Sequence, residues 1–232
     1  MTLAEKRGFF IDYLWFVLKN SFNHILFLFL FISFYGSAQG PERRFRTILS
    51  AGIAGCQVDG DTYAGYNKLG PYTGVYVNRP LNEKYELEFG ITYIQKGAKK
   101  NADPIQGDYS YYILRLNYAE VPFLFKMNYK KFKAEVGLSY AYLFSGHEEN
   151  YTGYYNDKKM RDTDIGYNIG GAYKLTDKLL VNMRFNYSLV PVRPLPSNGQ
   201  FVGTFWTRVL NKGLYNNDIV VSINYILQGK EK

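Results

Sequence analysis

His147, the second of the two histidines in the chain, stands in a stretch whose residue types could support nucleophilic catalysis. Ser145 lies two residues before it, and Glu148 and Glu149 follow it directly. A Ser–His–carboxylate relay needs the nucleophile, the base and the orienting acid within hydrogen-bonding distance of one another. On a strand, Ser145 and His147 would share one face while Glu148 points to the other. We therefore expect no catalytic residues, and we interpret His147 as a solvated loop residue.

Metal binding has little support in the residue types. The chain holds one cysteine and two histidines, which excludes a disulfide scaffold and leaves too few ligands for a Cys/His zinc site. The carboxylates that could offer oxygen ligands to a divalent cation lack a compact loop spacing. They are Asp59, Asp61, Asp157, Asp162 and Asp164. We expect no metal ion and no cofactor, and we interpret Cys56 as a small strand residue.

The composition favours an all-β protein. Aromatic residues make up 18% of the 232 residues, with 23 Tyr and 17 Phe, and there are 22 Gly. Charged residues contribute 21%, close to the globular average, so the chain is not disordered. The formal charge of +8 is spread along the sequence without a basic block. Nucleic acid is therefore not an expected partner.

Residues 1–38 have the features of a signal peptide. The apolar run Ile25–Phe34 follows Lys19, and small residues stand at positions −3 and −1 of a cut after Ala38. Removing this segment takes away three basic and two acidic residues from the formal charge of +8 and leaves residues 39–232 with +7. We expect this second part to form the folded domain.

The signal segment leaves two alternatives open. It contains a second apolar patch, Tyr13–Leu18, separated from the first by polar residues. Neither patch reaches the roughly 18 apolar residues of a spanning helix. A retained membrane anchor and a start codon assigned too early are the alternatives to a cleaved signal peptide.

Eight segments after residue 45 have the alternating pattern of β-strands. In the clearest, Tyr85–Ile94, the residues Tyr85, Leu87 and Phe89 alternate with Glu86 and Glu88. Strict alternation over nine or more residues is a strand pattern that no amphipathic helix reproduces. The predicted strands are Arg46–Cys56, Leu69–Asn78, Tyr85–Ile94, Tyr111–Met127, Phe132–Ser145, Asp164–Lys174, Leu179–Leu189 and Asp218–Leu227.

The segment Tyr111–Met127 is too long for one uninterrupted register. With strict alternation, Leu114 and Leu116 lie on one face and Phe123 on the opposite face, so both faces would carry apolar residues. A β-bulge near Asn117–Ala119 would reconcile the two halves.

The connections between these strands alternate in length. They are Gln57–Lys68, Arg79–Lys84, Gln95–Ser110, Asn128–Lys131, Gly146–Thr163, Leu175–Lys178 and Val190–Asn217, so long and short follow each other throughout. Outer-membrane barrels have an even number of strands, short periplasmic turns and long extracellular loops. Strands of nine to eleven tilted residues also match the thickness of the apolar membrane core.

The two faces of the strands decide which side meets lipid. One face carries Gly, Ala, Ser, Asn and opposite charges, which suits a narrow polar lumen; the other is apolar, with aromatic residues near the strand ends. The sequence therefore predicts an all-β fold, an eight-stranded antiparallel transmembrane up-and-down β-barrel in the outer membrane. A soluble lipocalin-like ligand-binding barrel, with the same strands and its apolar face inward, is the alternative.

Charged residues on the predicted inner face are expected to pair and to fill the lumen. They are Glu86, Glu88, Lys133, Glu135 and Arg184, with Arg115 and Glu120 as further candidates. An eight-stranded barrel leaves only enough interior for side chains, and an unpaired charge there would be costly. A selectivity filter is the functional alternative to this structural interpretation.

The longest connection, Val190–Asn217, is the candidate contact with a partner. It holds an apolar group of Phe201, Phe205 and Trp206. Exposed aromatic clusters of this kind mark contacts with proteins or lipopolysaccharide. Packing of the same residues over the barrel mouth explains them equally well.

Three stretches carry a further signature: QVDGDTYAGYNKLG (Gln57–Gly70), ELEFGITYIQKGAKK (Glu86–Lys100) and LNYAEVPFLFK (Leu116–Lys126), with Asn-Tyr-x-Glu-x-Pro at Asn117–Pro122 as the most specific part. They resemble the PorT-like outer-membrane β-barrel family of Gram-negative bacteria with type IX secretion and gliding. The resemblance extends over residues 39–227. It implies a barrel of about eight strands without known enzymatic activity, of which a minority of members contribute to protein secretion. The chain departs from usual outer-membrane proteins in ending with LQGKEK instead of a terminal aromatic residue.

Two classes of function follow. The first is a non-enzymatic structural or interaction barrel that supports protein secretion. Its expected partners are outer-membrane lipid and lipopolysaccharide, and other outer-membrane or secretion-system proteins are further candidates. The second is a lipid A-modifying outer-membrane enzyme, which would depend on His147 and its neighbours.

Overall fold

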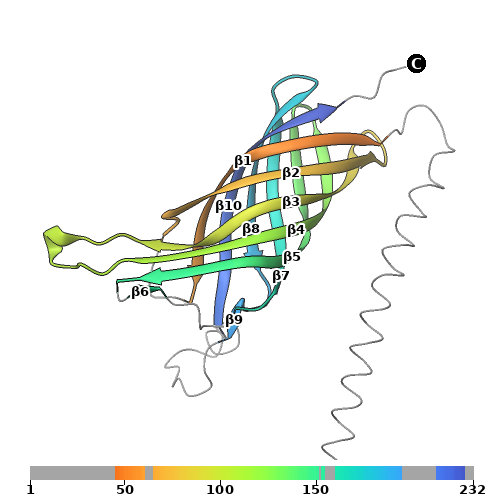
Figure 1. Cartoon of the computed structure of the whole chain (residues 1–232). Helices are drawn as coiled ribbons and strands as arrows, with labels where there is room; N and C mark the ends of the chain where they lie inside the picture. Colours follow the sequence, from red (N-terminus) through yellow and green to blue (C-terminus); the bar gives the residue numbers. More distant parts are fainter. Residues whose placement is uncertain (1–44, 61–64, 152, 155–159, 195–212, 228–232) are drawn as a thin grey trace, which may run out of the picture. The chain divides into compact units, whose positions relative to one another are not determined.

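Eight long antiparallel strands close into a ring in the computed structural model, which describes residues 45–60, 65–151, 153–154, 160–194 and 213–227. The strands are β1 (Arg46–Asp59), β2 (Lys68–Pro80), β3 (Tyr85–Lys100), β4 (Tyr112–Tyr129), β5 (Phe132–Asn150), β7 (Thr163–Lys174), β8 (Leu179–Ser188) and β10 (Gly213–Leu227). Each strand pairs with the next one along the chain, and β1 pairs with β10, so the ring has no free edge (Figure 1). The predicted eight-stranded up-and-down barrel is confirmed.

Two short strands and one turn of helix were not predicted. Strand β6 (Gly153–Tyr154) pairs with the end of β5, and β9 (Arg193–Pro194) pairs with the start of β10. A 3₁₀ turn spans Pro104–Gln106. No helix among the described residues is long and apolar enough to cross a membrane.

The short turns lie at one end of the barrel, and their residues explain their shape. Strands β4 and β5 are joined at Tyr129 and Phe132, and Lys130 between them adopts a positive φ of 54°. In the turn between β7 and β8, the Thr176 hydroxyl accepts hydrogen bonds from two backbone N–H groups. Asn82 does the same between β2 and β3 with its side-chain oxygen. Such side chains replace missing ladder partners in tight turns.

Three neighbouring strands are longer than a membrane crossing requires, and two of them, β3 and β5, continue beyond their predicted ends. Strands β3, β4 and β5 have 16, 18 and 19 residues, whereas about 9–11 tilted residues suffice to cross a bilayer. The segments Gln95–Lys100 and Gly146–Asn150, which were expected in loops, are paired strand. Together with residues 101–117 they form an extension that we call the arm, visible at the left of Figure 1. The alternating pattern weakens there because glycines and charges replace the apolar residues.

The predicted β-bulge is present, but its extra residue lies on β5 and not on β4. The register between β4 and β5 shifts between Asn117 and Tyr118, as expected, and the extra residue is Phe144 of β5. Strand β4 itself alternates without a break, so Leu114 and Leu116 are buried on the inner face. The bulge was expected to reconcile the faces of the two halves of this strand, but Leu114 and Leu116 stay on the inner face and Phe123 on the outer face.

The distribution of polarity is that of a membrane barrel. Buried positions include charged or amide side chains in seven of the eight long strands and the hydroxyl of Ser50 in β1, whereas the exposed outer face carries large apolar residues such as Ile91, with 69% of its surface exposed. A soluble lipocalin-like barrel would show the opposite arrangement. The aromatic residues Tyr85, Phe132 and Tyr173 stand at the turn end of the outer face. The ring centroids of Phe132 and Tyr173 lie 4.9 Å apart. This is the placement of an interfacial aromatic girdle.

Candidate functional site

The half of the lumen nearest the short turns is filled by paired charges, which we call the turn-side network. Its members are Glu86, Glu88, Lys126, Lys133, Glu135 and Arg184. The Lys133 ammonium lies 2.7 Å from Glu86, and the Arg184 guanidinium lies 2.6 Å from Glu135. All five lumen residues named from the sequence therefore lie in one network, with four of them in direct ion pairs with each other.

The sixth member, Lys126, was missed in the sequence. Its ammonium lies 2.6 Å from Glu88 and 3.0 Å from Glu135, so it links the two carboxylates. Its place on the inner face could not be inferred because the parity of Tyr111–Met127 was ambiguous. With Lys126, three cations face three carboxylates.

Neutral side chains complete the turn-side network. Asn78 donates to Glu86 at 3.0 Å and to Glu88 at 3.1 Å, and the Tyr76 hydroxyl accepts a hydrogen bond from Arg184 at 2.9 Å. The hydroxyls of Tyr72 and Tyr76 are also hydrogen bonded to each other. Each of the three carboxylates is thus held by at least two partners, as a buried ion pair requires.

A second group of charges lies nearer the long loops, and we call it the loop-side cluster. Lys96 is the shared cation: its ammonium lies 3.1 Å from Glu120, 3.5 Å from Asp164 and 3.5 Å from Asp218. All four side chains are at most 4% exposed. Glu120 was a candidate from the sequence, whereas Lys96 lay in a segment expected to be a loop.

Arg115 corrects the sequence interpretation. It was a further candidate for the lumen, but it is exposed and alternates with the buried Leu114 and Leu116, so it lies on the outer face of β4. The ambiguous parity of this segment is the reason for the error.

An apolar layer lies toward the loop end of the lumen, next to the loop-side cluster. Leu114 and Leu116 pack in one cluster with Ala98, Val192 and Leu214. These residues come from β3, β4, β10 and the chain beside β9. The lumen therefore contains two groups of ion pairs and an apolar layer near the loops, and a second apolar cluster with Ile48, Leu180 and Ile226 lies toward the turns.

This filling predicts the behaviour of the isolated protein. The folded protein should give little stable conductance in planar bilayers, because side chains occupy the lumen of so narrow a barrel. Without boiling it should also migrate faster in a denaturing gel than after boiling, since a closed hydrogen-bonded ring resists detergent. Large open-channel currents from the fast-migrating form would contradict a filled lumen.

The residues around His147 are divided between two faces. Glu148 points inward, where Arg193 lies 2.5 Å from it and the Tyr112 hydroxyl lies 3.0 Å away. His147 is on the outer face with Glu149, whose carboxylate lies 3.7 Å from the ring. Glu148 thus forms its ion pair with Arg193 on the inner face, whereas His147 lies on the outer face.

The other residues named from the sequence either have hydrogen-bonded or buried positions in the barrel or lie outside the described residues. Within the described ranges, no group of three or more His, Cys, Asp or Glu residues could hold a metal ion. Asp59 accepts hydrogen bonds from Gln57 and Asn217, and Cys56 is buried in β1. The signal segment 1–38, the carboxylates Asp61 and Asp157, and the candidate contact residues Phe201, Phe205 and Trp206 lie outside the described residues.

The tip of the arm is held by local hydrogen bonds. Asp108 accepts from Lys100 at 2.7 Å and from the backbone N–H of Ser110 at 2.9 Å, and Asp103 forms a β-bridge with Asp108. The hydrogen bond from Lys100 is the main reason why the pKa of Asp108 lies well below its usual range. The tip therefore presents a defined surface, on which Ile105 is 98% exposed.

A closed ring of eight strands, with an apolar outer face and a lumen packed with charge pairs, defines a transmembrane β-barrel protein of the outer membrane. Residues 37–192 match the sequence profile of the family described as outer membrane protein beta-barrel domain. The chain belongs to this family and resides in the outer membrane.

Several solved barrels are similar in structure at low sequence identity. The attachment invasion locus protein Ail of Yersinia pestis is 11% identical, with 79% of this chain and 99% of Ail covered and a TM-score of 0.44. Neisserial surface protein A is 12% identical, with 78% and 96% covered and a TM-score of 0.43. A major outer membrane protein from Thermus thermophilus is 11% identical, with 81% and 100% covered and a TM-score of 0.42. A search of curated proteins finds no match.

Proposed function

We propose that the protein is a non-enzymatic outer-membrane barrel that acts through its surface, and that it is one of the PorT-like members that support protein secretion. The observation that carries the proposal is the filled lumen. The turn-side network, the loop-side cluster and the apolar layer follow one another along its length. Because the interior of an eight-stranded barrel holds only side chains, the surfaces left for function are the outer face, the loops and the arm.

The motif shared with PorT-like proteins supports the barrel assignment through its contacts. In Asn-Tyr-x-Glu-x-Pro, Asn117 accepts a hydrogen bond from the Tyr93 hydroxyl at 2.8 Å on the outer face. Tyr118 and Glu120 face the lumen, where Glu120 binds Lys96 at 3.1 Å and the Tyr118 hydroxyl accepts from Asn216 at 3.3 Å. The motif thus joins the arm, the bulge and the loop-side cluster.

The arm offers the most defined protein-contact surface among the described residues. Its tip exposes Ile105 and Tyr109 beyond the barrel, and exposed apolar side chains on an ordered scaffold favour protein contacts. We place the contact with other outer-membrane or secretion-system proteins at the loop end of the barrel. The arm and the connection that holds Phe205 and Trp206 are its two candidate surfaces.

Deletion of the gene tests the interaction role against the lipid A-modifying alternative. We expect fewer secreted proteins in the deletion strain but an unchanged lipid A profile by mass spectrometry. Complementation with His147→Ala should restore secretion fully, because a partly exposed histidine contributes little to stability. Complementation with Ile105→Ser/Tyr109→Ser or Phe205→Ser/Trp206→Ser should restore it less well.

Two results would overturn this proposal. A difference in lipid A acyl chains that depends on His147 would establish the enzyme alternative. Normal secretion in the deletion strain would remove the secretion role, whatever the lipid A profile.

A further inference from the structure

We propose that the outer face of the barrel at the base of the arm binds one phosphate-bearing, acylated lipid of the outer leaflet, of the lipid A kind. Arg115 and Lys99 would hold the phosphate, and an apolar groove beside them would hold an acyl chain. This inference rests on the position of the barrel in the outer membrane and is independent of the secretion role.

The first observation is a pair of cations on one face of the arm, the exposed Arg115 and the partly exposed Lys99. Arg115 of β4 is exposed, and within the described part of the chain no carboxylate forms an ion pair with it. Its partner on β3 is Gly97, which has no side chain to cover the guanidinium. Lys99, two residues beyond Gly97 on the same face, is paired with Ile113. Diagonal neighbours of this kind lie about 7–8 Å apart, close enough for both cations to reach one phosphate.

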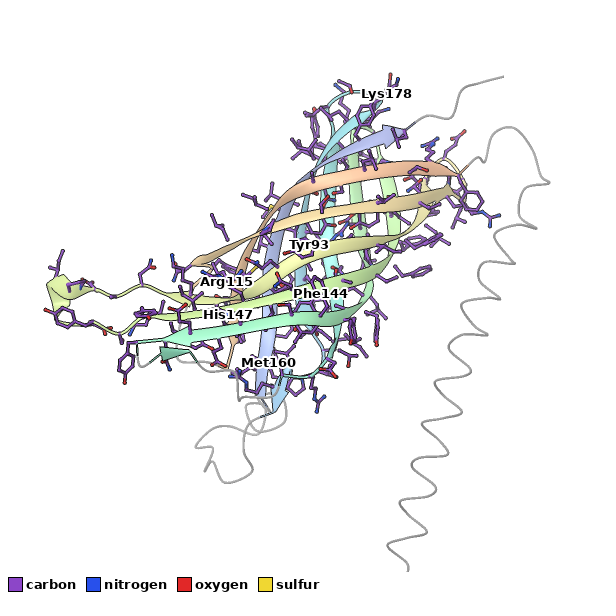
Figure 2. The ribbon with its side chains drawn as sticks, viewed as in Figure 1. Tyr93, Arg115, Phe144, His147, Met160 and Lys178 are labelled. Atoms are coloured by element: carbon purple, nitrogen blue, oxygen red, sulfur yellow. The ribbon has the colours of Figure 1, made fainter. Side chains whose placement is uncertain are left out.

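His147 completes this face on the other side of Arg115. It is the direct partner of Arg115 in the β4–β5 ladder, and it pairs with Glu149 at 3.7 Å. The Glu149 carboxylate also accepts a hydrogen bond from the Tyr111 hydroxyl at 3.2 Å. Figure 2 shows Arg115 and His147 beside each other where the arm meets the barrel.

The second observation is the height of these cations relative to the membrane. Outward residues along β4 change from Ala119 to Asn117 to Arg115, that is, from small and apolar to polar to charged. The ring of Tyr93 packs at 6.1 Å from that of Phe144, and its hydroxyl donates to Asn117. Aromatic side chains with this orientation mark the level of the lipid headgroups.

The spacing along the strand places Arg115 at the headgroups. Arg115 stands four positions from Ala119, or about 13 Å along a strand before tilt. A guanidinium at this level can bind two oxygens of one phosphate, which a more mobile ammonium does less specifically. Tyr93 and Phe144 lie between this position and the middle of the barrel (Figure 2).

The third observation is a groove of about 740 Å³ on the outer face directly beside these aromatic residues. Small side chains, including Ala51, Thr73 and Ala119, line it between larger ones such as Phe144 and Leu49. This volume falls within the range of small-molecule sites. Since the face lies in the membrane, the occupant that fits is an acyl chain. A lipid bound here would place its phosphate at Arg115, its glycerol or sugar region at Tyr93 and Phe144, and its acyl chain in the groove.

The test uses the folded full-length protein in detergent and native mass spectrometry to count bound lipid. The probes are lipid A with its phosphates, the same lipid A after removal of its phosphates, and inorganic phosphate. The site variant is Arg115→Gln. The matched control is Arg79→Gln, which changes an exposed outward arginine at the turn end of β2. A second variant, Ala119→Trp, fills the groove without touching the cations.

We expect Arg115→Gln to weaken binding of phosphorylated lipid A about tenfold, as expected for loss of a charge-assisted contact. The lipid without phosphates should bind the native protein as weakly as phosphorylated lipid binds Arg115→Gln. Ala119→Trp should also weaken binding, and Arg79→Gln should not. The faster migration of unboiled protein in a denaturing gel verifies that each variant is folded.

Three outcomes would overturn the proposal. In the first, Arg115→Gln and Arg79→Gln weaken binding equally, which indicates unspecific attraction of anionic lipid. In the second, phosphate removal leaves binding unchanged, so the acyl chains alone are recognised. In the third, inorganic phosphate displaces the lipid completely, so the site is one for a free anion.

Discussion

Replacing Lys96 with methionine is expected to destabilise the barrel by about 3–5 kcal/mol, the range observed when one partner of a buried ion pair is removed. Lys96 is the shared cation of Glu120, Asp164 and Asp218, and it is 1% exposed. Methionine has a similar length but no charge. It would leave three carboxylates together without the cation that separates them.

The measurement is the free energy of unfolding in urea, with the protein reconstituted in lipid vesicles. Lys174→Met is the matched control, because Lys174 is 40% exposed and its partner Asp177 is 87% exposed. Exposed pairs contribute little to stability, so we expect no measurable change in the control.

A combined variant separates the loss of charge balance from a defect in packing. Asp164→Asn and Asp218→Asn added to Lys96→Met remove the repulsion that the single change creates, so the triple variant should be more stable than Lys96→Met alone. The coupling between such neighbouring sites is measured by comparing single and combined variants. Equal stabilities of Lys96→Met and the native protein would contradict the role of Lys96 in the loop-side cluster.

Replacing Gly52 with valine should prevent normal closure of the ring. Gly52 of β1 is paired with Ser222 of β10, and a Cβ at this position would lie 2.1 Å from the carbonyl oxygen of Val221. That atom belongs to the backbone, so it cannot rotate away as the end of a side chain could. We expect a loss of at least about 3 kcal/mol, the upper part of the range for overpacked interiors.

The fraction of fast-migrating protein in unboiled gel samples measures closure directly. Ala51→Val adds two methyl groups at the neighbouring position, which is exposed on the outer face. It should leave this fraction unchanged, whereas Gly52→Val should reduce it strongly. A Gly52→Val protein that folds and unfolds like the native one would show that β1 and β10 can separate slightly at no cost.

The barrel could be predicted from the sequence because its two faces meet different surroundings. Every strand that crosses the membrane alternates between lipid and a polar lumen, and segments such as Leu179–Leu189 match β8 to within one residue. Turn positions followed from the same pattern. The level of the bulge was predicted correctly, since β4 and β5 shift register at Asn117, but its extra residue lies on β5 and not on β4.

The arm and the loop-side cluster could not be predicted because the pattern changes where the strands leave the membrane. Gln95–Lys100 has charged and small residues on both faces, so it was interpreted as a loop, and Lys96 was lost with it. The inward leucines Leu114 and Leu116 look like lipid-facing residues by type alone. Their burial under the loop end depends on contacts with Val192 and Leu214, which are distant in sequence.

The ion pairs in the lumen have a consequence for the order of assembly. Lys96 of β3 reaches Asp164 of β7 and Asp218 of β10, and Arg184 of β8 supplies a charge for Glu135 of β5. A growing sheet of the first five strands would therefore carry several of these charges before all their partners arrive. Strands entering the membrane one by one would each face this cost, which is high in a bilayer. The charges favour insertion of the strands as one cooperative unit, with neutrality reached when the last strand joins the first.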